Sequence, residues 1–152
     1  MSEKDCQISS SEWQAMRIVW SLGEVTSSQV VDQLQQKYGW SASTTKTLLR
    51  RLVEKGYLEV ARTGHRFSYK AQLSEEEGMY QNLKAELSAM CDMHKGAVLL
   101  RLIDEIPLSQ EDIDLLVAKL KEKKQTAPEA VPCNCLAACH PVMEEMTMKA
   151  EK

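Results

Sequence analysis

The sequence has no uninterrupted run of the roughly eighteen apolar residues that a membrane span needs. Its first stretch, MSEKDCQISSSEW, also lacks the apolar block of a secretory signal. These absences favour a cytoplasmic protein, in which cysteines are normally reduced thiols. The five cysteines are an odd number, with Cys6 and Cys91 isolated and the other three close together near the C-terminus. Metal binding or redox chemistry is therefore expected rather than a disulfide framework.

The charge is unevenly distributed along a chain of otherwise globular composition. Of the 152 residues, 43% are hydrophobic and 27% are charged, and a chain of this length can bury a core without disulfides. The net charge is −3, yet residues 41–71 hold seven Lys or Arg residues and only two Glu residues. In an acidic protein, such a basic window indicates either a solvated face or a nucleic-acid-binding surface.

The pattern around the basic window predicts three helices. Capping signatures that begin at Ser9 and Thr26 start helices expected over 10–22 and 27–37. The segment SASTTKTLLRRLVEKG predicts a third helix, which ends near Gly56 because glycine is common just after a helix.

Two short β-like runs follow the third helix. They cover residues 57–62 and 66–70, and the Thr63-Gly64-His65 segment between them is typical of a hairpin turn. Three helices followed by a basic hairpin is the order of a winged helix-turn-helix, in which the third helix reads the DNA groove and the wing touches the backbone.

The third helix is expected to have one apolar and one cationic face. The apolar face holds Thr45, Leu48, Leu49, Leu52 and Val53. The opposite face holds Ser43, Thr44, Lys46, Thr47, Arg50 and Arg51. Short hydroxylated side chains allow a close approach to the major groove, and Lys or Arg can reach guanine acceptors. The alternative is a solvent-exposed face whose residues only stabilise the helix.

Residues 8–74 resemble the penicillinase-repressor (BlaI/MecI) family of bacterial winged-helix repressors. The segments SEWQAMRIVW, WSASTTKTLLRRLVEKG and RFSY carry this resemblance. It implies that Ser43, Thr44, Lys46 and Thr47 contact operator DNA. It also implies phosphate contacts from Arg51 and from wing residues around Arg66, and the candidate DNA-binding set is completed by Arg50 and Arg62. The three tryptophans are Trp13, Trp20 and Trp40, and they are expected to pack in the core rather than stack on bases.

The region after the wing is predicted to form three further helices. The first begins after Ser74, the second covers about 95–106, and the third begins after Ser109 and ends in KEKK. These apolar helices offer no globular core of their own and need a partner surface, which a two-fold dimer commonly supplies. The family resemblance implies the same homodimer, with two winged helices on palindromic half-sites.

The expected fold class is mainly α with a small β wing. The domains are a disordered N-terminus over 1–7, a winged-helix DNA-binding domain over 8–73, a helical dimerisation region over 74–124 and a flexible metal-binding tail over 125–152. The linker QTAPEAVP, with two prolines, opens this tail.

The tail contains the cluster CNCLAACH, which supplies the candidate metal ligands Cys133, Cys135, Cys139 and His140. A tetrahedral set of three cysteines and one histidine suits Zn(II), whereas bare thiolates at low coordination number suit Cu(I). The two metals are therefore expected to compete. Further candidate soft ligands are the tail of a second subunit and Met143, Met146 and Met148. The alternative is three incidental thiols.

The tail is similar to the C-x-C-x4-C-x-C tail of CopY-type copper-responsive repressors, but its own pattern is C-x-C-x3-C-H. The spacing is one residue shorter, and His140 lies near the place of the fourth thiolate, which puts a two-copper, four-thiolate cluster within one chain in doubt. The resemblance implies a zinc-loaded dimer on an operator upstream of copper-export genes, which leaves DNA when Cu(I) displaces zinc. A copper chaperone is a further candidate partner, as the Cu(I) donor.

Other functions fit the same residues. The protein could be an antibiotic-responsive repressor switched by proteolysis, or a sensor of zinc excess or thiol oxidation on the same scaffold. From a different class, it could be a copper carrier or a thiol oxidoreductase. An enzyme needs an ordered pocket with a base held near its nucleophile, whereas this cluster follows a proline-bearing linker, so a non-enzyme is expected. Cys91 and His94, three residues apart, could also share a metal.

Overall fold

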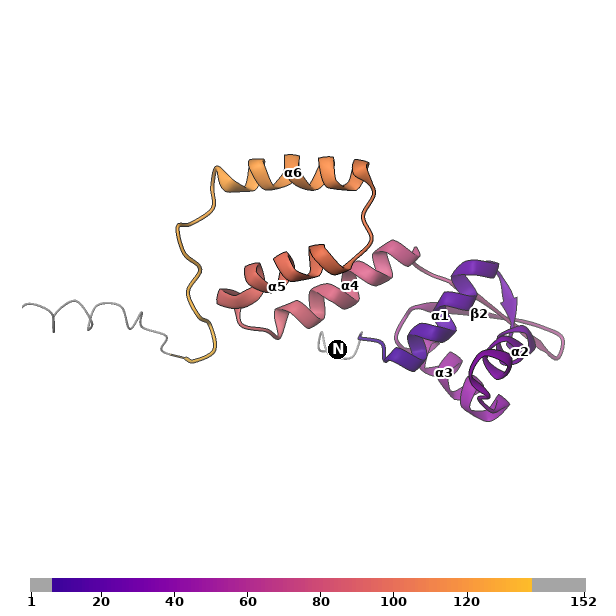
Figure 1. The fold of residues 1–152 in the computed structure, drawn as a ribbon. Helices are drawn as coiled ribbons and strands as arrows, with labels where there is room; N and C mark the ends of the chain where they lie inside the picture. The colour runs from indigo at the N-terminus through magenta and orange to yellow at the C-terminus, as the bar shows by residue number, and fades with distance from the viewer. Residues whose placement is uncertain (1–6, 138–152) are drawn as a thin grey trace, which may run out of the picture. The chain divides into compact units, whose positions relative to one another are not determined.

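The computed structural model describes residues 7–137, and its chain divides after Glu86 into two compact units (Figure 1). Within these residues, no helix combines the length and the apolar character that a membrane span requires. The first unit contains the winged helix and most of the helix that follows it. The second unit contains two further helices and the start of the tail.

The first unit has the expected three helices, which are α1 (Ser10–Leu22), α2 (Ser27–Tyr38) and α3 (Ala42–Glu54). Ser9 begins α1 with a reciprocal capping box: its Oγ accepts from the Glu12 amide at 3.2 Å, and its own amide donates to the Glu12 carboxylate at 2.8 Å. Thr26 and Gln29 form the same arrangement at α2. Both helix starts are therefore set by short local sequences, as predicted.

The wing is part of a three-stranded antiparallel sheet rather than an isolated hairpin. Strands β2 (Leu58–Thr63) and β3 (Arg66–Ala71) pair along their full lengths. The short strand β1 (Val25–Thr26) pairs with the other edge of β3, which gives the order β1-β3-β2. Gly64, with φ +65°, occupies the tight turn at the wing tip, where a side chain would be strained.

The core of the first unit lies where its three helices meet the sheet. Its largest fully buried apolar side chains are Met16, Leu34, Leu49, Leu52 and Leu58. The partly buried Trp13, Trp20 and Trp40 pack against this core, which confirms that the tryptophans are packing residues. The apolar face of α3 is also confirmed, with Thr45, Leu48, Leu49 and Leu52 buried.

A buried ion pair ties α1 to the end of α3. Glu12 is 2% exposed, and Lys55 Nζ donates to its carboxylate at 2.7 Å and to the Gln7 carbonyl at 2.8 Å. Burial raises the pKa of Glu12, but the hydrogen bonds from Lys55 and Ser9 outweigh that effect and hold the pKa below its usual value. Lys55 therefore stabilises the first unit through Glu12, although it belongs to the basic window of residues 41–71.

Helix α4 (Glu75–Ser88) begins against the first unit through a close contact with Trp20. The indole Nε1 of Trp20 donates to the Leu73 carbonyl at 3.0 Å. A Cβ added at Gly78 would lie 2.9 Å from the Trp20 ring, so only glycine allows this approach without a shift. Trp20 thus fixes the start of α4.

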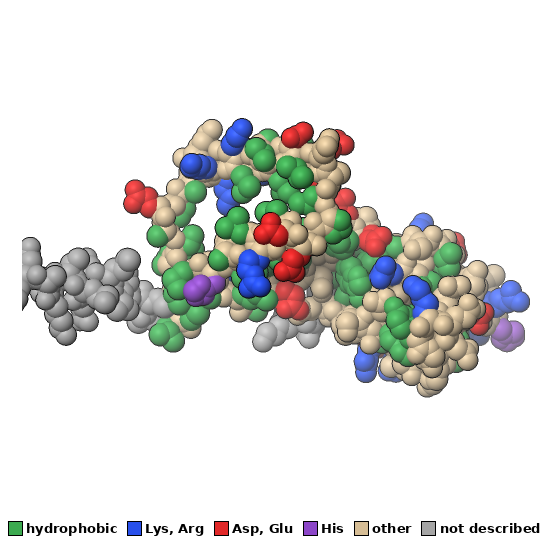
Figure 2. Space-filling view, viewed as in Figure 1, with side chains coloured by type: hydrophobic (Ala, Val, Ile, Leu, Met, Phe, Trp, Pro, Cys, Tyr) green, Lys and Arg blue, Asp and Glu red, His purple; other side chains and the backbone are tan. Residues whose placement is uncertain are grey.

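The second unit exposes apolar side chains along both of its long helices, α5 (Asp92–Glu105) and α6 (Gln110–Lys124), and neither helix has a buried residue. Figure 2 shows hydrophobic side chains along both. Leu100 and Leu115 are 69% and 65% exposed. The reciprocal capping box of Ser109 and Asp112 fixes the start of α6, as predicted.

Candidate DNA-binding surface and thiol cluster

Helix α3 presents the predicted polar face to solvent. Ser43, Thr44, Lys46, Arg50 and Arg51 are exposed, and Thr47 is half-buried. The sequence achieves this because the buried residues recur at helical spacing on the opposite side. Two hydroxyl groups, those of the N-cap residue Ser41 and of Thr47, also stabilise the helix. Ser41 Oγ accepts from the Thr44 amide at 3.2 Å, and Thr47 Oγ1 donates to the Ser43 carbonyl at 3.0 Å.

A shallow depression runs along this face and is lined by Ser43, Lys46, Thr47 and Arg50. Two of its lining residues have short hydroxylated side chains, and the other two are cations. This combination suits a backbone or base edge of DNA that approaches closely, because the hydroxyls leave room and the cations offset phosphate charge.

A second depression joins three elements of the first unit, α2, α3 and the wing. Its lining residues are Thr26, Ser27, Ser28, Lys46, His65, Arg66, Phe67 and Tyr69. Thr26, Ser27 and Ser28 form the start of α2, so the positive end of its helix dipole lies beside this depression and favours an anion such as phosphate. Burial raises the pKa of Tyr69, so its phenol remains protonated.

Sequence reasoning missed the contribution of the α2 start and of His65 to this surface. The capping signature at Thr26 was a usable signal, since it marks a helix N-terminus and therefore a potential phosphate site. On its own this signature predicts only a helix boundary, because the pairing of β1 with β3, which brings Thr26 beside the wing, is not visible in the sequence.

Arg62 and Arg66 are both exposed on the wing but differ in their surroundings. Arg66 lines the second depression together with Lys46. Arg62 Nε donates to the Gly64 carbonyl at 2.9 Å, and its guanidinium lies over the Phe67 ring, 5.6 Å from the centroid. Arg62 therefore braces the wing tip, and its DNA contact stays a prediction.

The second unit brings together three thiols, those of Cys91, Cys133 and Cys135. The three Sγ atoms lie within 4.8 Å of one another, and those of Cys91 and Cys133 are 3.7 Å apart. Sulfur ligands about 2.3 Å from one tetrahedral zinc ion are about 3.8 Å apart. The three thiols are thus spaced as ligands of a single soft ion, and the donor set fits Zn(II) or Cu(I).

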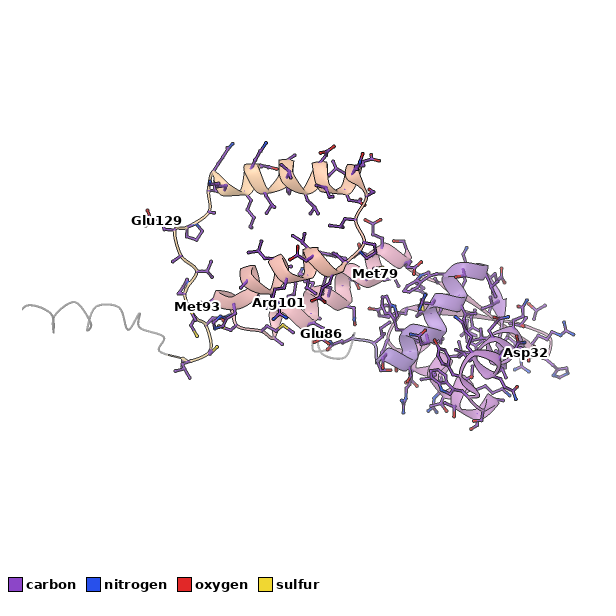
Figure 3. All side chains as sticks on the ribbon, viewed as in Figure 1. Asp32, Met79, Glu86, Met93, Arg101 and Glu129 are labelled. Carbon is purple, nitrogen blue, oxygen red and sulfur yellow. The ribbon has the colours of Figure 1, made fainter. Side chains whose placement is uncertain are left out.

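The segment around Asn134 joins the tail to the start of α5. Cys91 is the N-cap residue of α5 but makes no side-chain capping hydrogen bond. Asn134 Oδ1 instead accepts from the Asp92 amide at 2.9 Å, so a tail residue satisfies this helix terminus. In Figure 3 the segment that passes Glu129 returns to the end of α5 where Met93 lies.

The contacts within the cluster shift the pKa values of Cys91 and Cys135 in opposite directions. The interaction with the Cys135 thiol is the main cause that holds the pKa of Cys91 below its usual value. Hydrogen bonds with Cys133 and Cys91 raise the pKa of Cys135 to about 12. Cys91 therefore loses its proton more readily than Cys135 does.

The predicted metal residues are only partly within the described part of the chain. Cys133 and Cys135 do lie together, whereas Cys139, His140 and the tail methionines lie outside the described residues. Cys91 joins the cluster from a position 42 residues before Cys133. The sequence offered no direct signal for this, because only the packing of an irregular segment brings the two together. The cluster holds Cys133 and Cys135 beside Cys91, whereas the sequence had suggested His94 as its metal-sharing neighbour.

Comparisons with known proteins cover most of the chain. The family model described as penicillinase repressor matches residues 8–122. The "uncharacterized 16.5 kDa protein in ptsI 3' region" of Latilactobacillus sakei is 47% identical over 136 residues, 90% of this chain and 93% of that one. The methicillin resistance regulatory protein MecI of Staphylococcus aureus is 27% identical over 123 residues, 81% of this chain and 100% of MecI. A solved structure of the CopR repressor is 38% identical, covers 45% of this chain and 99% of its own, and has a TM-score of 0.39. The family match ends before Cys133 and Cys135.

Proposed function

Since the chain belongs to the penicillinase repressor family and is thus a DNA-binding transcriptional repressor, we propose that it is a copper-responsive repressor. In this proposal a homodimer binds a palindromic operator of copper-export genes in its zinc form. The protein leaves the operator when the thiolates of its C-terminal region exchange Zn(II) for Cu(I).

The DNA-binding half of the proposal is supported by the charge and shape of the first unit. The exposed face of α3 and the depression beside the wing share Lys46, and Arg50 and Arg66 extend the basic surface on either side. A helix with this face fits the major groove, while the wing and the α2 start suit the flanking phosphates.

The dimer is supported by the apolar faces of α5 and α6. Side chains such as Leu100 and Leu115 are more than half exposed, which a soluble single chain rarely tolerates over so continuous a surface. A second copy of the chain covers such a face with a self-complementary one, and a two-fold axis then relates the two copies of the recognition helix.

The single observation that supports a metal-dependent switch is the cluster of three thiols in the second unit of this DNA-binding repressor. Thiolates hold both Zn(II) and Cu(I), and the two ions prefer different coordination numbers. A switch requires the two forms of the protein to differ in operator affinity, and a tenfold difference corresponds to about 1.4 kcal/mol of coupling.

The proposal is tested by the fluorescence anisotropy of a labelled palindromic operator titrated with full-length protein. Metal-free, zinc-loaded and Cu(I)-titrated protein are compared at one salt concentration, because phosphate contacts make affinity steeply salt-dependent. We expect tight binding of the zinc form and release by Cu(I). The double variant Cys133→Ser, Cys135→Ser should bind the operator with one affinity whichever metal is added, because it lacks two of the proposed ligands, and Cys6→Ser, which should respond like wild type, serves as the matched control. Identical curves for the three metal states contradict the proposal.

One observation favours a second candidate, a thiol-oxidation sensor. The Sγ atoms of Cys91 and Cys133 are 3.7 Å apart, close enough to form a disulfide after a small movement. Hydrogen peroxide would oxidise the two thiols to a disulfide and be reduced to two waters. Release of the operator by peroxide, with no response to Cu(I), would identify this function.

A further inference from the structure

We propose that Cys91 is a ligand of the metal held by Cys133 and Cys135, so that metal binding fastens the tail to the first turn of α5. The proposal rests on the proposed function for the presence of a soft metal. It goes beyond that function in assigning a ligand outside the tail and a route from the metal to the dimerisation helices.

The first argument is the geometry of the sulfur atoms. The distance of 3.7 Å between the Sγ atoms of Cys91 and Cys133 equals, within about 0.1 Å, the sulfur separation around one tetrahedral zinc ion. The Sγ of Cys135 lies within 4.8 Å of both. A shift of about 1 Å or less is therefore enough to place all three sulfur atoms on one ion.

The second argument is that the same stretch is held against α5 by a side chain other than its thiols. The Asn134 side chain accepts from the Asp92 amide at 2.9 Å, and this contact sets the residue between the two tail cysteines against the start of α5. The Cys135 amide donates to Cys133 Sγ at 3.4 Å. One three-residue segment therefore caps the helix and directs two thiols at Cys91.

The third argument is electrostatic. Ligand cysteines bind metals as thiolates, and negative charge is favoured near a helix N-terminus. Cys91 is the N-cap residue of α5, and its neighbours Cys133 and Cys135 share that location. The position of Cys91 at the N-terminus of α5 thus favours a metal-binding thiolate at this residue.

The consequence is a direct mechanical route from the metal to the dimer. Helix α5 carries exposed Leu99, Leu100 and Ile103, which belong to the apolar face that a second copy would cover. Because Zn(II) and Cu(I) differ in preferred ligand number, the two metal forms differ in how firmly the start of this helix is held.

The test uses full-length protein loaded with Co(II) alone, whose thiolate charge-transfer absorbance grows with the number of sulfur ligands. In Cys91→Ser, the intensity of this band should fall below that of wild type by the contribution of one thiolate ligand. The variant should also bind Co(II) roughly tenfold or more weakly than wild type. Serine is a good N-cap residue, so the variant keeps the start of α5. Cys6→Ser, which removes a cysteine outside the proposed ligand set, should leave band and affinity unchanged.

A second variant examines the docking segment without removing a ligand. Asn134→Ala should weaken Co(II) binding severalfold and leave the band at saturation unchanged. In addition, hydrogen exchange at the Asp92 amide should slow when metal binds to wild type and to Cys6→Ser, but not when it binds to Cys91→Ser.

The outcomes separate this inference from the proposed function. If Cys91→Ser keeps the full band and the wild-type affinity, Cys91 is not a ligand and the inference is overturned, whatever Cu(I) does to operator binding. If the band reports Cys91 but Cu(I) leaves operator binding unchanged, the inference stands and the copper-responsive function fails. A wild-type protein without any thiolate band overturns both.

Discussion

The two units of the chain use leucine in opposite ways. In the first unit, Leu49 and Leu52 of α3 are fully buried in a core that the unit completes by itself. In the second unit, Leu100 of α5 and Leu115 of α6 are mostly exposed, and neither helix has a buried residue. The first unit therefore completes its own core, whereas the apolar helices of the second unit leave a surface that the proposed dimer would cover.

The largest expected effect tests the contrast between the buried and the exposed leucines directly. Leu52→Ala should destabilise the first unit by about 3 kcal/mol, because it removes a fully buried side chain and leaves a cavity. The matched variant Leu100→Ala should change that unfolding free energy by less than about 0.5 kcal/mol and instead raise the monomer fraction. Urea denaturation and sedimentation velocity measure the two quantities. Equal losses of folding stability in both variants would contradict the distinction.

A middle-sized effect concerns the buried carboxylate of the first unit. The lowered pKa of Glu12 means that its pairing with Lys55 stabilises the fold above the usual carboxyl pKa. This stability is lost as the pH falls below that range toward the lower folded pKa. Glu12→Gln should cost about 2 kcal/mol at neutral pH, and the difference from wild type should shrink on acidification. Denaturation at a series of pH values measures it, and a difference independent of pH would show that the charge of Glu12 is unimportant.

The smallest expected effect concerns the DNA-binding surface. Lys46 lines both depressions of the first unit, so Lys46→Met should weaken operator binding by about 1 kcal/mol. It should also reduce the salt slope by about one if the contact is to phosphate. The matched control is Lys37→Met on α2, since Lys37 is exposed but lines neither depression. Equal effects of the two variants would mean that overall charge alone explains binding.

How far the sequence predicted the structure also differs between the units. Helices α1 to α3 and the polar face of α3 follow from capping residues and helical spacing, which are local signals. Strand β1 was missed because two residues are too few for any periodicity, and its pairing with β3 depends on the packed unit. The expected two-stranded wing is therefore part of a three-stranded sheet.

In the second unit the helices were again predicted, but the membership of the thiol cluster was not. Spacing within the tail pointed to Cys133 and Cys135, whereas Cys91 is brought in by a long-range contact through Asn134. Contacts of an irregular segment with a distant helix have no periodic signature. The division into four domains also follows from local sequence patterns, and it stays a prediction. The structure divides into two compact units after Glu86.

The packing of the tryptophans gives the protein a built-in optical label. All three lie in the first unit, and the rest of the chain has none. Trp20 touches Gly78 at the start of α4 and donates to the Leu73 carbonyl, so its emission depends on how that helix begins. A shift in the emission spectrum on adding metal to unlabelled protein would therefore report, without any probe, that a change in the second unit had reached the DNA-binding unit.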